Sequence, residues 1–217
     1  MRLAVLGATG RTGVPLVRQA LDAGHDVKGL VRSEEKAREL LPVDDGRLEL
    51  VVGDLRELDV VTRLVTGADA VVDTTGPPFR GAQEGLRTEG AQVLVQALRD
   101  AGVRRLVGLT GAGVPQPQDT PGLPDKAFRL VMAKVFPKIM KDSLGYTEAV
   151  RSSDLDWTVV RAPRLVDKPG RGLDQVTVVE AVGDGSGTTL ARQDLAAVLL
   201  RLAAEGGWER QTPVASW

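Results

Sequence analysis

The sequence predicts a doubly wound α/β fold, a mostly parallel sheet with helices on both faces. Short apolar runs alternate with segments of helical period from the first residues onward. The runs are continuously apolar, as parallel strands buried on both faces are, and do not alternate with polar residues. A glycine-rich turn follows the first run, and a helical stripe begins directly after it. Together these features predict a Rossmann-type arrangement that starts at the first strand.

The first half of the chain supplies five expected strands, at residues 3–6, 27–31, 48–52, 70–72 and 106–109. Between them, Val14, Val17, Ala20 and Leu21 form one helical stripe, with Gly24 as its stop. Further helices are expected at residues 35–41, 58–65 and 86–101.

After residue 110 the pattern changes. Residues 111–124 are rich in proline and glycine and predict a long loop, the kind of segment that is usually functional. Helices are expected at 125–140 and 143–153, strands at 156–161 and 175–181, and a last helix at 192–204. Asp194 lies where a carboxylate favours a helix start. We expect a single domain over residues 1–217, in which residues 111–190 form a substrate-side segment.

Composition narrows the function classes. The chain has no cysteine, which excludes disulfides and thiolate metal sites, and we expect no metal. Lysine and arginine number 28 against 29 acidic residues. The chain therefore has no large net charge that would favour binding to nucleic acid or to a membrane. No apolar run reaches the length of a signal peptide or a membrane span. We therefore expect a cytoplasmic protein, monomeric or homodimeric.

The turn Gly7-Ala8-Thr9-Gly10-Arg11-Thr12-Gly13 has the pattern of a dinucleotide-binding loop. Gly7 allows a sharp turn off the strand, Gly10 leaves room for a pyrophosphate, and Gly13 permits close helix–strand contact. Backbone N–H groups at a helix start suit phosphate. Thr9 and Thr12 add hydroxyl groups, and Arg11 adds a charge.

The end of the second strand indicates NADP in preference to NAD. An acidic residue there would hold the ribose of NAD, but the sequence has Arg32, with Lys36 one helical turn further on. A guanidinium can face a 2′-phosphate with two donors. Glu34 and Glu35 argue the other way, although both also suit the first turn of a helix.

Five further positions belong to the expected site at the carboxyl edge of the sheet. Asp54 can accept from the adenine amino group, with Leu55 against the ring, or it can cap the next helix. Thr74 and Gly76 follow the fourth strand. Thr110 ends the fifth strand and is a candidate catalytic residue, which can orient a nicotinamide or cap the strand.

The GATGRTG turn, the LVR of strand two, the VVGD of strand three and the DWTVVRAPRLVD segment resemble the atypical short-chain dehydrogenase/reductase proteins. The chain is most similar to the NAD(P)H-binding branch of the biliverdin-IXβ and flavin reductases. This resemblance implies an NADPH-dependent reductase of a small conjugated acceptor such as a flavin, quinone or tetrapyrrole. It also implies that Pro163 and Arg164 line the nicotinamide side.

The catalytic residues of that branch do not carry over. Gly111 stands where a serine is expected, Ser143 where a histidine is expected, and Val150 replaces the lysine of a Tyr-x-x-x-Lys pair. Tyr146, the single tyrosine, is the candidate proton donor, or an amphipathic surface residue. These departures leave two alternatives: a dinucleotide-binding sensor that does not turn over, and an epimerase- or dehydratase-like enzyme.

Overall fold

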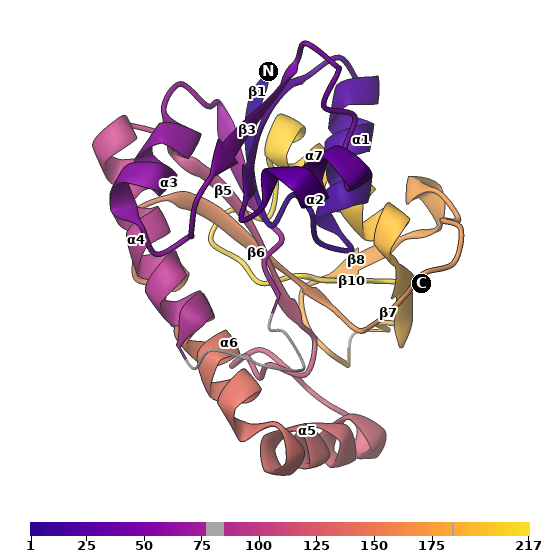
Figure 1. Ribbon diagram of the computed structural model, residues 1–217. Coiled ribbons are helices and arrows are strands. Elements are labelled where there is room, and N and C mark those ends of the chain that lie inside the picture. Colours follow the sequence, from indigo (N-terminus) through magenta and orange to yellow (C-terminus); the bar gives the residue numbers. More distant parts are fainter. Residues whose placement is uncertain (77–84, 184) are drawn as a thin grey trace.

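The computed structural model describes residues 1–76, 85–183 and 185–217. Within these residues, one sheet has the strand order β3-β2-β1-β4-β5-β6-β10-β8 (Figure 1). All its pairings are parallel except β10 with β8. The strands are β1 (Arg2–Leu6), β2 (Asp26–Val31), β3 (Leu48–Val52), β4 (Ala70–Asp73), β5 (Arg105–Gly111), β6 (Asp156–Ala162), β10 (Val214–Ser216) and β8 (Thr177–Val179). The predicted fold class is confirmed.

Helices cover both faces of this sheet, and each layer buries its own apolar cluster. One cluster joins the sheet to α1 (Gly13–Asp22), α2 (Glu34–Leu40) and α7 (Arg192–Glu205). The other joins it to α3 (Leu58–Val65), α4 (Leu86–Ala101) and α6 (Pro137–Arg151). Burial of apolar surface on both sides explains why the strands are continuously apolar.

The helix that follows the glycine-rich turn ends where the sequence predicts. Gly24 has a φ of +82°, and the N–H of His25 donates to Ala20 O at 3.0 Å. This closure satisfies a carbonyl at the end of α1 and favours glycine, which has no Cβ to strain.

Beyond residue 110 the structure differs from the prediction in three ways. The expected helix 125–140 is α5 (Leu123–Val135), which ends before Pro137, and α6 begins there rather than at residue 143. Proline lacks an N–H and is favoured in the first turn of a helix, so the break falls at Pro137. The prediction also missed β10 and a separate pair, β7 (Arg164–Val166) with β9 (Thr189–Ala191). The strand expected at 175–181 divides into η1 (Leu173–Gln175) and the short β8.

In the described part of the chain, no helix combines the length and apolar character needed to cross a membrane.

Candidate nucleotide site

The glycine-rich turn leaves β1 and leads into α1, as its pattern predicts. Gly7 has a φ of +74°, and a Cβ there would meet Thr74 Oγ1 at 2.9 Å. The N–H of Gly10 donates to Gly7 O at 2.8 Å, and a Cβ on Gly10 would lie 2.9 Å from the same oxygen. A Cβ on Gly13 would overlap Gly7 O outright. The shape of the turn itself therefore requires glycine at positions 10 and 13, even before a bound pyrophosphate is considered.

The start of α1 presents unpaired donors. The N–H groups of Arg11, Thr12 and Gly13 donate to no other group among the residues that the structure describes. Thr12 occupies the N-cap position without a capping side-chain hydrogen bond. Free N–H groups at the positive end of a helix suit phosphate oxygens, so this turn fits the pyrophosphate of a dinucleotide.

The side chain of Arg11 is engaged elsewhere. It forms an ion pair with Asp167, which also accepts from Arg192 Nη1 at 2.6 Å. The hydrogen bond from Arg11 is the main reason that the pKa of Asp167 is lowered. Asp167 follows β7, so this contact ties the glycine-rich turn to the C-terminal part of the chain.

At the end of β2, Arg32 and Lys36 are exposed, and Ser33 caps α2 by accepting from Lys36 N at 3.2 Å. Glu34 forms an ion pair with Arg38 at 2.6 Å. One of the two carboxylates that argue against a 2′-phosphate is thereby neutralised by a neighbour.

Asp54 lies beside this corner but does not cap a helix. Its Oδ1 accepts from the N–H and Nε of Arg56 at 3.0 and 2.9 Å, and the N-cap of α3 is Glu57. The alternative that Asp54 is an N-cap is therefore wrong. The hydrogen bond from Arg56 lowers the pKa of Asp54, and the charge of Arg32 adds to the effect. Leu55 packs against α4 at Gly90. Any Cβ at position 90 would overlap the Leu55 side chain.

At the switch point between β1 and β4, Thr74 stabilises the turn. Its buried hydroxyl donates to Leu6 O at 2.9 Å. Gly76 is exposed, and a Cβ there would meet no described atom within 4 Å. Pro163 is half-buried where the chain leaves β6. Thr74 thus links the carboxyl end of β1 to β4.

A buried polar cluster lies beneath this edge, between the sheet and α4 and α6. The Tyr146 side chain is fully buried against Gly108, and the guanidinium carbon of Arg87 lies 4.1 Å from its ring centroid. Arg87 Nη2 donates to Leu109 O at 2.6 Å. Thr110 Oγ1, Tyr146 Oη and Arg87 Nε are buried without a hydrogen-bond partner in the described chain.

Tyr146 is consequently neither a surface residue nor open to the edge. Burial raises its pKa well above the ordinary value, and the negative charge of Asp73 raises it further. A fully buried hydroxyl with a raised pKa keeps its proton, and any part that it plays in a reaction passes through other groups.

Sequence reasoning missed the network that fixes the loop after β5. Asp119 accepts from Arg161 Nη1 at 2.8 Å, from Arg129 Nη2 at 2.6 Å, and from the N–H groups of Gln116 and Val182. Arg161 is completely buried, and its Nε donates to Thr212 O at 2.7 Å. The available signal was an arginine inside the largely apolar strand DWTVVRA, one residue before its end.

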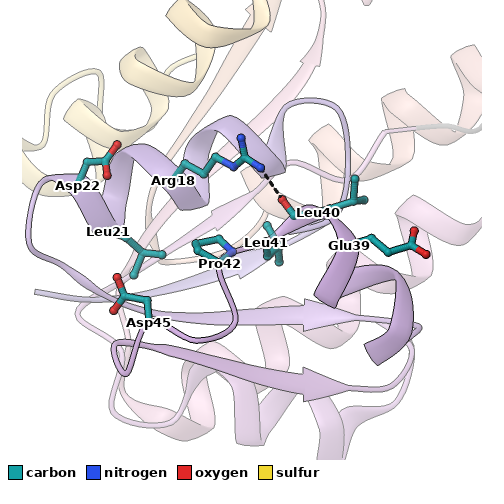
Figure 2. A pocket seen from close by; sticks show the side chains of 8 residues that line it. All are labelled: Arg18, Leu21, Asp22, Glu39, Leu40, Leu41, Pro42 and Asp45. Atoms are coloured by element: carbon teal, nitrogen blue, oxygen red, sulfur yellow. Dashed lines mark hydrogen bonds between the residues drawn. The ribbon is translucent and has the colours of Figure 1, made fainter.

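A surface cavity of about 320 Å³ lies away from this site (Figure 2). It adjoins the C-terminal ends of α1 and α2, and Arg18 Nη2 donates to Leu40 O at 3.0 Å beside it. Both helices begin near the carboxyl edge of the sheet, so their ends lie toward the opposite edge. The cavity is lined by Arg18, Leu21, Asp22, Glu39, Leu40, Leu41, Pro42 and Asp45.

Known proteins share both the sequence and the fold. Residues 7–206 match the protein family described as NAD(P)H-binding. A 3-diazoavenalumate denitrifying reductase from a Streptomyces species is 36% identical over 185 residues, which are 79% of this chain and 58% of that protein. This chain therefore spans less than two thirds of that relative. The uncharacterized YwnB of Bacillus subtilis is 25% identical over 198 residues, with 85% and 84% covered.

Two solved structures illustrate the shared fold. A short-chain dehydrogenase/reductase of Veillonella parvula in complex with NADP aligns with a TM-score of 0.79 and 18% identity, covering 100% of this chain and 94% of that one. ChuY of Escherichia coli O157:H7, an anaerobillin reductase, aligns with a TM-score of 0.80 and 19% identity, covering 100% and 97%. Since the family match spans nearly the whole chain and its turn carries the free N–H groups described above, the protein belongs to the NAD(P)H-binding family.

Proposed function

We propose that the protein is an NADPH-dependent reductase that transfers hydride to a small conjugated acceptor, such as a flavin, a quinone or a linear tetrapyrrole. The observation that carries the proposal is the glycine-rich turn at the carboxyl end of β1, next to β4, where three N–H groups have no partner among the described residues. Two relatives, the Streptomyces protein and ChuY, are themselves named as reductases.

The proposed cofactor is NADPH because of the charges at the adenosine corner. Arg32 and Lys36 are exposed there, while Glu34 is paired with Arg38. A 2′-phosphate would meet two cations that form no ion pair among the described residues, whereas NADH would find an arginine at position 32 in place of the acidic residue that holds its 2′-hydroxyl.

The proposed acceptor site lies beside Gly111. Apart from the adjacent residues, the nearest described atom to a Cβ at Gly111 is Gly113 N at 4.0 Å, so the described chain leaves space for a side chain there. Thr110 is the adjacent residue of the strand. In this proposal its side chain orients the nicotinamide ring. Bound NADPH would supply the hydride.

The proton for the reduced acceptor comes from water in this proposal. Tyr146 is buried beneath Gly108 and does not open onto the edge. Flavins and quinones can take a proton from solvent after reduction, so an enzyme that acts on them by positioning alone needs no acid of its own.

The same burial of Tyr146 favours a second candidate, an NADP-binding sensor without turnover. Gly111, Ser143 and Val150 stand at the family's catalytic positions, and of these three only Ser143 carries a polar side chain. The epimerase or dehydratase alternative has no comparable support, because Val150 cannot replace the lysine that such chemistry needs.

Acceptor-dependent oxidation of NADPH distinguishes the two. The purified chain is mixed with NADPH and a panel of flavins, quinones and tetrapyrroles, and the loss of reduced nicotinamide absorbance is followed. The reductase proposal expects oxidation that scales with protein concentration for at least one acceptor. Tight NADPH binding with no oxidation by any acceptor supports the sensor.

A further inference from the structure

Helix α5 presents a broad apolar face to solvent. None of its residues is buried, and Leu123 is 82% exposed. Of the eight large apolar side chains that are exposed in the described chain, five lie on this one helix: Leu123, Phe128, Leu130, Val131 and Val135. Figure 1 shows α5 at the margin of the molecule, away from the sheet. A contiguous apolar face of this kind marks an interaction surface.

The opposite side of α5 fixes which way this face points. Arg129 is bound to the buried carboxylate of Asp119, and Asp125 accepts from Gly122 N at 3.2 Å to form a cap. The Arg129 contact holds the polar side of the helix toward the protein, whereas the Asp125 contact is internal to the start of the helix. The apolar face is consequently held outward.

Positive charge accompanies the apolar face. Residues 123–141 contain five basic residues and one acidic residue, and Arg129 is paired with Asp119, so the remaining four lysines and one aspartate carry a local charge of +3 in a chain whose net charge is −1. Four of the seven lysines in the sequence lie in this stretch, and Lys126, Lys134 and Lys141 are exposed. The expectation of no membrane contact rested on the charge of the whole chain, which hides this local excess.

We infer that α5 docks on the surface of an anionic phospholipid bilayer, with its apolar side chains among the lipids and its lysines at the headgroups. An exposed amphipathic helix with apolar and basic side chains is the form that binds in the plane of such a surface. This inference does not depend on the proposed reductase activity.

Charge and size favour the bilayer over other occupants. A two-fold contact between copies would bring the lysines of one helix against those of the other, which is repulsive. Thirteen helical residues span about 20 Å, more than one small acceptor would cover. Phe128 also lies beside Gly113, in the loop after β5, so docking would turn the carboxyl edge toward the bilayer.

Flotation with vesicles tests the inference on the full chain, without added dinucleotide. We expect binding to phosphatidylcholine vesicles that contain about a third phosphatidylglycerol, and little binding to pure phosphatidylcholine. Binding should weaken between about 0.1 M and about 1 M salt, as the Debye length falls from about 10 to about 3 Å.

Two paired variants should reduce binding. Each lysine near an anionic surface contributes about fivefold, so Lys126→Glu with Lys134→Glu should weaken binding by about 25-fold or more. Phe128→Ser with Val131→Ser should weaken it by at least about tenfold. The helix contributes no buried residue, so both pairs should keep the thermal midpoint of the unmodified chain.

Matched controls change the same chemistry elsewhere on the surface. Arg63→Glu with Lys168→Glu makes the same charge change, and Val52→Ser with Leu58→Ser removes two exposed apolar side chains outside α5. Controls that lower binding as much as the α5 pairs would overturn the inference, as would equal binding to both vesicle types. So would a dimer, measured by light scattering, that Phe128→Ser with Val131→Ser disperses while no vesicle binding is seen.

Discussion

Replacing Asp119 with alanine removes the acceptor at the centre of a buried network. Arg161 has no exposed surface and would keep its charge with only carbonyl partners, while two backbone N–H groups would lose theirs. Removing one partner of a buried ion pair costs about 3–5 kcal/mol. For a chain of this size the thermal midpoint should then fall by roughly 6–20 °C.

Differential scanning fluorimetry measures this midpoint, with Asp154→Ala as the matched control. Asp154 accepts from Arg99 at 2.9 Å, but both side chains of that pair are largely exposed. Exposed pairs contribute little, so Asp154→Ala should leave the midpoint nearly unchanged. Equal midpoints for the two variants would refute the assignment of Asp119 as a structural anchor.

The same comparison has a pH signature. Burial acts to raise the pKa of Asp119, but hydrogen bonds from Arg161, Val182 and Gln116 outweigh it, and the pKa lies below the ordinary value. A lowered folded-state pKa gives stability that is present above the unfolded value of about 3.9 and is lost as pH falls through the folded value. The difference in thermal midpoint between the unmodified chain and Asp119→Ala should therefore become smaller below about pH 4. A gap independent of pH would contradict this reasoning.

Four other substitutions test the site. Arg32→Ala should erase a preference for NADPH over NADH of roughly 10–100-fold, the worth of one charge-assisted contact of ~1.5–3 kcal/mol, in titration calorimetry; equal affinities in the unmodified chain would contradict it. Gly10→Val should abolish NADPH binding and lower the midpoint, since its Cβ would press on Gly7 O; full-strength binding would place the pocket elsewhere. Tyr146→Phe removes a buried hydroxyl, so it should change flavin reduction by less than about tenfold, whereas a loss of roughly 100-fold or more would make Tyr146 the acid. Gly111→Ser fits the space at this position, and Gly111 has no positive φ that serine would strain. The added hydroxyl should raise tetrapyrrole reduction more than flavin reduction. An equal effect on both acceptors would count against the idea that a proton donor is missing at position 111.

The first half of the fold could be predicted because its signals are local. The apolar strands, the glycine-rich turn and the Gly24 stop are each defined within a few neighbouring residues, and the structure has them close to the predicted positions. The strand order of the sheet follows the Rossmann-type prediction across β1 to β6.

The rest depends on contacts between distant residues. Asp119 and Arg161 are separated by 42 positions, and nothing near either one indicates the other. Tyr146 is buried because Gly108 leaves space for its hydroxyl, a fit between a helix and a strand that no periodicity records. The strand β10 is three residues long, too short for an alternating pattern, and is defined by its pairing with β6 and β8.

A single-turnover experiment tests the proposed activity most directly. The chain, in excess over NADPH so that the dinucleotide is bound, is mixed rapidly with a flavin, and the reduced nicotinamide absorbance is followed. The account predicts complete oxidation at a rate that saturates with flavin concentration, and no enhancement over the protein-free reaction in Gly10→Val. Bound NADPH that stays reduced with flavin, quinone and tetrapyrrole alike would contradict the reductase proposal.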